Sequence, residues 1–144
     1  MRRISKAALI KAACRVRERA VAPYSRFKVG AALLTANGEI VTGANVESAS
    51  YGLTCCAERV ALFKALTEGH KSLVAVAVVA RTSGGPSPCG ACRQLLAEFA
   101  PGAVVWIADT LCPGNVTELT VAELLPAPFL KAGKNSVERD WSKK

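Results

Sequence analysis

At the centre of the chain stands the run Leu73-Val-Ala-Val-Ala-Val-Val-Ala80, which is apolar throughout and built of β-branched and small residues. A strand without alternating polar residues is typical of a sheet whose two faces are both covered. We therefore expect this run to be a central strand that lies between two layers of helices, and this expectation decides the class of fold.

The segments on either side of this run alternate between helix and strand patterns. On the amino-terminal side, Asn37-Gly38 is a strong signal for a hairpin turn, and Gly69 is a suitable end for the preceding helix. On the carboxy-terminal side, Thr120-Val-Ala-Glu123 has the pattern of a capping box and starts a short helix that ends before Pro126. The expected elements in chain order are a helix over 4–16, strands over 27–35 and 40–42, a helix over 55–68, the strand over 73–80, a helix over 89–99, strands over 104–108 and 116–119, and the short helix from 120.

This order of elements predicts an α/β fold, a three-layer α/β/α sandwich around a five-stranded mixed sheet. The last two strands, Val104–Ala108 and Val116–Leu119, are joined only by the segment from Asp109 to Asn115. A parallel connection needs about a dozen residues or more, so we expect this last pair to be antiparallel. The length of 144 residues suits one domain, which we place at residues 1–130, followed by a charged and flexible tail over 131–144.

The composition argues against several classes of protein. Because 51% of the residues are apolar, the chain is not of the disordered class. No apolar stretch approaches the roughly 18 residues of a membrane span, so we expect no membrane association. The net charge of +8 comes from basic residues that are spread along the chain and do not alternate with aromatic residues. Nucleic-acid binding is therefore only a minor alternative.

The basic amino-terminal segment bears on the expected compartment. Lys6 and Lys11 interrupt its apolar residues before they could form the core of a secretory signal. A mitochondrial transit peptide would also be basic and amphipathic. A structural helix is favoured, because apolar residues repeat on one helical face at Ile4, Ala8, Leu9, Ala12, Ala13 and Val16. We expect a cytoplasmic protein, in which clustered cysteines indicate metal or redox chemistry rather than disulfides.

Two segments carry the chemistry, Cys55-Cys-Ala-Glu-Arg59 and Pro88-Cys-Gly-Ala-Cys-Arg-Gln94. Each lies at an expected helix start, where the helix dipole favours the thiolate form of cysteine that binds metal. Cys89 and Cys92 are one helical turn apart and can face the same ion, and Cys56 would supply a third sulfur. Three protein ligands leave the fourth position of a tetrahedral zinc ion open, as in catalytic zinc sites.

Glu58 and Arg59 have expected roles beside this metal. Glu58 lies two residues after Cys56 and can act as a general acid and base without being a ligand. Three thiolates around one Zn²⁺ leave a negative charge, and Arg59 is placed to offset it by donating hydrogen bonds to a ligand sulfur. Cys-x-Glu followed by Pro-Cys-x-x-Cys is the three-cysteine form of the signature of zinc deaminases.

Other interpretations of the cysteines stay open at this point. A structural zinc with four sulfurs would need Cys55, Cys14 or Cys112 as its fourth ligand, and a redox dithiol at Cys89 and Cys92 is a further alternative. Cys55 is disfavoured as the fourth ligand, because it is adjacent to Cys56 and neighbouring residues in a chain rarely reach one ion in good geometry. Cys14 and Cys112 are expected to be buried as small apolar side chains.

Over residues 4–129 the chain resembles the small homotetrameric, zinc-dependent cytidine deaminases. The stretches that carry the resemblance are Ala22-Pro-Tyr-Ser25, Phe27-Lys-Val-Gly-Ala-Ala-Leu-Leu34, Gly43-Ala-Asn-Val-Glu47, Ala49-Ser-Tyr-Gly52, Cys56-Ala-Glu-Arg59, Pro88-Cys-Gly-Ala-Cys-Arg-Gln94 and Glu123-Leu-Leu-Pro126.

The resemblance implies a set of site residues. Cys56, Cys89 and Cys92 would bind one zinc ion per subunit, and Glu58 would shuttle protons. The resemblance further implies contacts with the substrate: hydrogen bonds from Asn45 and Glu47 to the ribose hydroxyls, packing of Phe27 on the pyrimidine, a backbone contact of Ala57 with the base, and the carbonyl of Ser87 facing the departing ammonia. Residues matching Tyr51 and Phe129 would reach the pocket of a neighbouring subunit in a homotetramer.

The function that follows is hydrolytic deamination of cytidine and 2′-deoxycytidine, a step of pyrimidine salvage. The antiparallel last strand pair agrees with a free nucleoside as substrate. A deaminase of another aminopyrimidine, such as blasticidin S or an N4-modified cytidine, is the closest alternative. A non-catalytic nucleic-acid-binding module that uses zinc only for folding is the alternative from another class of protein.

Overall fold

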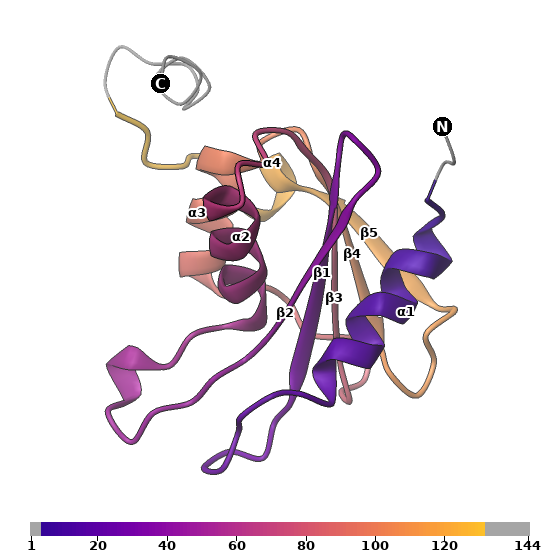
Figure 1. Cartoon of the computed structure of the whole chain (residues 1–144), viewed down its shortest axis with the longest axis vertical. Coiled ribbons are helices and arrows are strands. Elements are labelled where there is room, and N and C mark those ends of the chain that lie inside the picture. The colour runs from indigo at the N-terminus through magenta and orange to yellow at the C-terminus, as the bar shows by residue number, and fades with distance from the viewer. Residues whose placement is uncertain (1–3, 132–144) are drawn as a thin grey trace.

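The computed structural model describes residues 4–131, which form a five-stranded sheet with helices on both faces (Figure 1). The tail expected over 131–144 lies, apart from its first residue, outside the described residues. The elements in chain order are α1 (Lys6–Arg17), β1 (Val29–Thr35), β2 (Ile40–Ala44), the 3₁₀ turn η1 (Tyr51–Leu53), α2 (Ala57–Thr67), β3 (Leu73–Ala80), α3 (Gly90–Phe99), β4 (Val104–Asp109), β5 (Val116–Thr120) and α4 (Val121–Leu124).

The sheet has the strand order β2-β1-β3-β4-β5, with β3 in the middle. β3 pairs antiparallel with β1 and parallel with β4, so the sheet is mixed. β4 and β5 are antiparallel, as the short connection between them predicts. The predicted three-layer α/β/α fold is confirmed, and the capping box that starts the last helix is present at Thr120 and Glu123.

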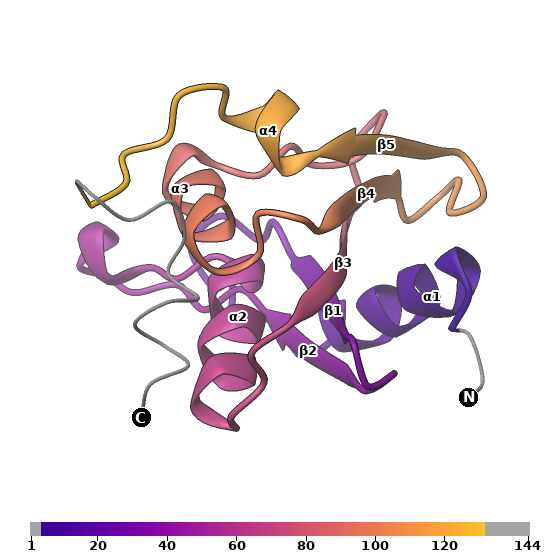
Figure 2. The ribbon, with the colours of Figure 1, turned by 90° about the horizontal axis from the view of Figure 1, so that it is seen from above.

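The two faces of the sheet have separate cores. α1 covers one face through Leu9, Ile10 and Ala13, while α2 and α3 cover the other face (Figure 2). The predicted apolar face of α1 was partly wrong, because Ala8 is exposed and Ile10 is buried. Alanines surround both positions, and their small apolar side chains give a weak signal for which face turns inward.

Two glycines allow the helices to pack directly on the sheet. A Cβ atom at Gly30 would lie 2.0 Å from the carbonyl oxygen of Ala13 on α1, and one at Gly43 would lie 2.4 Å from the backbone nitrogen of Ala61 on α2. β2 continues two residues beyond its predicted end, because Gly43 and Ala44 pair with β1. None of the helices within residues 4–131 has the length and apolar character that crossing a bilayer requires.

Gly43→Ala is expected to lower the free energy of unfolding by about 3 kcal/mol, the upper end of the range for overpacking. The added methyl group would meet backbone atoms of α2, which cannot rotate away as a side chain can. Urea denaturation measures the change. Gly114→Ala is the matched control, because a Cβ atom there meets nothing within 4 Å. Equal stabilities of the two variants would contradict the close packing.

Candidate functional site

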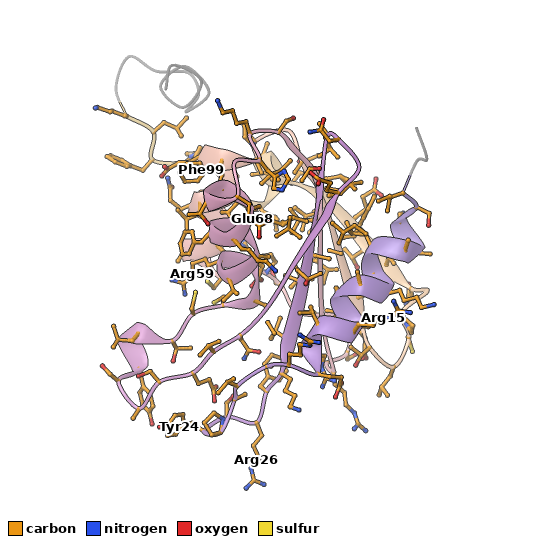
Figure 3. All side chains as sticks on the ribbon, viewed as in Figure 1. Arg15, Tyr24, Arg26, Arg59, Glu68 and Phe99 are labelled. Carbon is orange, nitrogen blue, oxygen red and sulfur yellow. The ribbon has the colours of Figure 1, made fainter. Side chains whose placement is uncertain are left out.

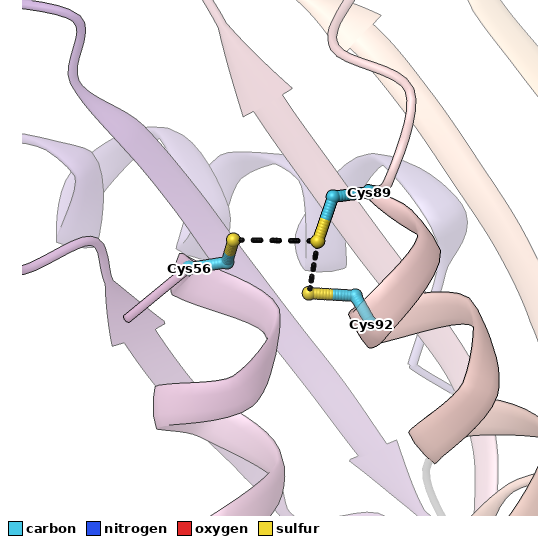
Figure 4. Close-up of side chains that lie close together, drawn as sticks. All are labelled: Cys56, Cys89 and Cys92. Carbon is cyan, nitrogen blue, oxygen red and sulfur yellow. Dashed lines mark hydrogen bonds between the residues drawn. The ribbon is translucent and has the colours of Figure 1, made fainter. Parts of the chain in front are cut away.

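Two helix starts bring three cysteines together. Cys56 is the N-cap of α2, and Cys89 is the N-cap of α3, so each helix begins one residue later than its cysteine. Neither side chain caps its own helix by a hydrogen bond, which leaves the sulfurs free to face one another. Cys92 lies in the first turn of α3 and points toward the same place (Figure 4). The spacing of the two sequence segments predicts this cluster.

The geometry of the three sulfurs fits a zinc ion. The Sγ atoms of Cys56 and Cys89 are 3.6 Å apart, those of Cys89 and Cys92 are 3.5 Å apart, and all three lie within 4.8 Å of one another. Sulfurs that bind a tetrahedral zinc ion at about 2.3 Å are roughly 3.8 Å from each other. The cluster therefore needs little movement to bind the metal.

The other cysteines do not join this cluster, and a fourth sulfur ligand is not among the described residues. Cys14 lies on α1, which covers the opposite face of the sheet, and it packs against the apolar core there while only half-buried, so the prediction that it is buried holds in part. The prediction that Cys112 is buried was wrong, because it is exposed in the loop between β4 and β5. Within the described chain all cysteines are free, so the cluster is not a disulfide.

Arg59 lies in the first turn of α2 (Figure 3), and its guanidinium reaches the cluster. Its Nη2 atom donates to the Sγ atom of Cys56 at 3.5 Å and to the carbonyl of Thr54 at 3.4 Å. The hydrogen bond to a ligand sulfur is the one that the sequence predicts. The neighbouring thiol of Cys92 lowers the pKa of the Cys56 thiol to about 5, and Arg59 assists. The cluster is thus prepared to hold a thiolate, the form that binds metal.

Glu58 is buried beside the cysteines. It lies in the first turn of α2, and only 5% of its surface is exposed. Burial raises the pKa of its carboxyl group to about 7. An ionisable side chain is rarely buried without a partner or a function. A carboxyl group that adjoins a metal-binding cluster and a cavity can carry protons between a bound molecule and water.

A cavity of about 230 Å³ opens beside Glu58. It is smaller than the roughly 300–1,000 Å³ of a pocket for a drug-sized ligand, and it suits a small molecule. Its lining consists of Ser25, Phe27, Val29, Asn45, Glu47, Thr54, Cys56, Ala57, Glu58, Pro86, Ser87 and Cys89. The structure thus gathers Phe27, Asn45, Glu47, Ala57 and Ser87, five of the predicted substrate-binding residues, around one space.

Asn45 fixes the wall of this cavity. Its side-chain amide donates to the carbonyl of Phe27 and accepts from the backbone nitrogen of Val29, both at 2.8 Å. The side chain thus continues the hydrogen bonding between β2 and β1 to Phe27, which precedes the first residue of β1. One N–H of Asn45 remains for a bound molecule, because a primary amide has two.

The carboxylate of Glu47 accepts hydrogen bonds from the loop that precedes Phe27. Its Oε1 atom accepts from the backbone nitrogens of Tyr24 and Ser25, each at 3.0 Å, and Oε2 accepts from the Ser25 hydroxyl. That hydroxyl holds the pKa of Glu47 below its usual value. Arg26 has a φ of 58°, which is uncommon for a side chain other than glycine. Glu47 therefore supports a constrained turn immediately before Phe27.

Tyr51 and Phe129 do not line the cavity of their own chain. They are 79% and 83% exposed, Tyr51 on η1 and Phe129 beyond α4. The cavity also includes residues that the sequence does not single out, namely Ser25, Val29, Thr54 and Pro86. Ser25 and Val29 belong to stretches that carry the resemblance, so their place near the site had a signal. Thr54 and Pro86 had none, because small and apolar lining residues have no chemical signature.

Comparisons with known proteins agree with this geometry. The family model described as the cytidine and deoxycytidylate deaminase zinc-binding region matches residues 4–108. A cytidine deaminase of Halalkalibacterium halodurans is 54% identical over 127 residues, which covers 88% of this chain and 96% of that protein. A blasticidin-S deaminase of Bacillus cereus is 30% identical, with 74% of this chain and 80% of that protein covered.

Among solved structures, the crystal structure of a cytidine deaminase from Burkholderia pseudomallei has a TM-score of 0.83 and 48% sequence identity. The match covers 88% of this chain and the whole of that one. The cytidine deaminase of Mycobacterium tuberculosis has a TM-score of 0.77 at 35% identity, over 90% of this chain and the whole of that one. The similarity therefore extends over the sheet, the helices and the site together.

Proposed function

The chain belongs to the cytidine and deoxycytidylate deaminase family, and we propose that it converts cytidine and 2′-deoxycytidine to uridine and 2′-deoxyuridine with release of ammonia. The observation that carries the proposal is the buried carboxyl group of Glu58 beside three cysteine sulfurs, at the wall of a cavity of about 230 Å³. In the reaction, the bond from C4 of the pyrimidine to its exocyclic nitrogen breaks, and water supplies the oxygen of the new carbonyl.

Cys56, Cys89 and Cys92 would hold one zinc ion per subunit between the starts of α2 and α3. When bound, the ion supplies Lewis-acid chemistry that makes water nucleophilic at neutral pH. Glu58 takes a proton from the attacking water and delivers it to N3 of the ring. It then takes the remaining proton from the hydroxyl group on C4 and delivers it to the departing amine, which leaves as ammonia while the new carbonyl forms. Its burial keeps bulk water away from these proton transfers.

The cavity wall would hold the nucleoside. Phe27 packs against the pyrimidine ring, the Ala57 backbone contacts the base, and the carbonyl of Ser87 faces the departing ammonia. Asn45 and Glu47 bind the ribose hydroxyls. Each carboxylate oxygen of Glu47 can accept more than one hydrogen bond, so the bonds from Tyr24 and Ser25 leave capacity for a hydroxyl.

We further propose a homotetramer in which neighbouring subunits complete each site. The exposed rings of Tyr51 and Phe129 support this, because aromatic side chains are enriched in interfaces between proteins. The reduced thiols of the metal site suit the cytoplasm, where we place the protein. Neither a membrane nor a nucleic acid is needed as a partner.

A deaminase of another aminopyrimidine is the second candidate, since a blasticidin-S deaminase is among the relatives. The higher identity to cytidine deaminases favours the plain nucleoside. Zinc-loaded protein should be incubated separately with cytidine, 2′-deoxycytidine and blasticidin S, and the change in ultraviolet absorbance followed. Conversion of the two nucleosides supports the proposal. Conversion of blasticidin S alone, or of none of the three, overturns it.

Arg59→Gln is expected to lower kcat for cytidine by about 10–100-fold without loss of zinc, the usual effect of removing a partner of a metal ligand. The guanidinium offsets the negative charge of the cluster through its bond to Cys56. Steady-state kinetics and zinc content are the two measurements. Arg19→Gln, an exposed arginine beyond the end of α1, is the matched control. Release of zinc from Arg59→Gln would contradict a role limited to charge.

A further inference from the structure

Gln94 forms a two-point clasp on the backbone of Phe129. Its Nε2 atom donates to the Phe129 carbonyl at 2.6 Å, and its Oε1 atom accepts from the Phe129 backbone nitrogen at 3.0 Å. The second N–H of the amide is available to Glu98, whose Oε1 atom lies 2.9 Å from Nε2. The side chain therefore bonds both backbone groups of one residue that lies 35 positions away.

Arg93, the residue before Gln94 on α3, holds the other end of the same segment. Its Nη1 atom donates to the carbonyl of Leu124 at 2.9 Å, while Nε and Nη2 donate to Pro88 and to the hydroxyl of Ser87. Two consecutive side chains of α3 thus fasten residues 124–129 at both ends. Pro126 and Pro128 stiffen the stretch between, because proline fixes φ. The segment is tied to the helix that bears Cys89 and Cys92.

At Phe129 the backbone is held by hydrogen bonds while the side chain is exposed, and this difference suggests what the clasp does. The backbone is bonded on both sides, yet 83% of the residue remains exposed. A ring held in place before association loses less conformational freedom when it enters a partner's surface. We propose that Gln94 is a positioning residue that fixes the backbone of Phe129 and so sets its ring for the pocket of a neighbouring subunit, an inference that rests on the proposed shared site.

The clasp makes a specific kinetic prediction. Gln94 does not line the cavity, so its loss leaves Glu58 and the cysteines in place. A loosened segment would present the ring less often and weaken binding of the nucleoside. Loss of binding that is equal in ground state and transition state raises KM and leaves kcat unchanged.

The test compares Gln94→Met with Glu98→Ala. Gln94→Met keeps the volume of the side chain and removes both bonds to Phe129, whereas Glu98→Ala removes only the bond within α3. We expect Gln94→Met to raise KM for cytidine about ten-fold with little change in kcat. Hydrogen exchange at the Phe129 amide should become fast in this variant and stay slow in Glu98→Ala. Slow exchange in Gln94→Met would overturn the clasp.

Two further variants, Phe129→Ala and the double variant Gln94→Met/Phe129→Ala, distinguish a failure of the role of Gln94 from a failure of the proposed shared site. If Gln94 acts through Phe129, both single variants raise KM and the double variant raises it no further than Phe129→Ala alone. Unchanged KM in Phe129→Ala would overturn the shared pocket and the role of Gln94 together. Raised KM in Phe129→Ala with unchanged KM in Gln94→Met, or additive effects, would overturn the role of Gln94 only.

If Gln94→Met does not fold, the double variant Gln94→Glu/Glu98→Gln, which exchanges the two side chains, replaces it. The carboxylate that Gln94→Glu introduces can still accept from the Phe129 amide and from the amide that Glu98→Gln introduces, but it cannot donate to the Phe129 carbonyl. KM for cytidine should rise in the exchange variant. A KM equal to that of the unaltered protein would overturn the proposal.

Discussion

Glu58→Gln is expected to lower kcat for cytidine by about three to four orders of magnitude, while fold and bound zinc stay unchanged. Glutamine has the shape of the carboxyl group it replaces, but it cannot take up and release a proton at neutral pH. The site offers no substitute, because no other carboxyl group than those of Glu58 and Glu47 lines the described cavity, and Glu47 is bonded to the loop before Phe27. Single-turnover kinetics with cytidine measure the rate of the chemical step.

Glu47→Gln is the informative companion to that variant. It removes a carboxylate from the same cavity but leaves Glu58 in place, so we expect a raised KM and a smaller fall in kcat. Zinc content and the midpoint of thermal unfolding should be measured for both variants, since a loss of metal would imitate a catalytic defect. Turnover of Glu58→Gln near that of the unaltered protein would show that another group carries the protons.

The sequence predicts the sheet better than the ends of its elements. The run from Leu73 to Ala80 indicates a central strand and nothing else, because a long apolar run is buried in such a fold, and only Val74 near its start is exposed. The end of β2 has no comparable signal. Gly43 and Ala44 are weak strand formers, and they extend the strand only because β1 and α2 lie against them. Tertiary contacts decide such boundaries.

The residues of the site likewise fall into those that the sequence predicts and those whose roles depend on tertiary contacts. The cysteines and Glu58 are found from spacing, because ligands on one helical turn and at two helix starts are local patterns. The bonds of Glu47 to the loop at Tyr24 and Ser25 span more than 20 residues, and the clasp of Gln94 on Phe129 spans 35. A contact between a side chain and a backbone group far away in the sequence leaves no periodic pattern of residues, so these roles can be recognised only in the structure.

Cys92→Ser is expected to release the zinc ion and to lower the free energy of unfolding by about 4 kcal/mol when zinc is present at a thousand times its dissociation constant. Cys92 is 1% exposed in the first turn of α3 and clusters with Cys56 at the start of α2, so a bound metal would hold the two helices together. Serine nearly conserves the volume, which separates the loss of a ligand from the creation of a cavity. Zinc content after dialysis and urea denaturation with and without a chelator measure both effects.

Cys55→Ser is the matched control, because it makes the same chemical change next to Cys56, at a cysteine that is not part of the cluster. It should retain one zinc ion per chain and most of its stability. A chelator should destabilise Cys55→Ser and the unaltered protein equally and leave Cys92→Ser unaffected, since a variant without metal has none to lose. Full zinc in Cys92→Ser would remove this residue from the ligand set. Loss of zinc from Cys55→Ser would revive the four-sulfur structural site, in which no position is open for catalysis.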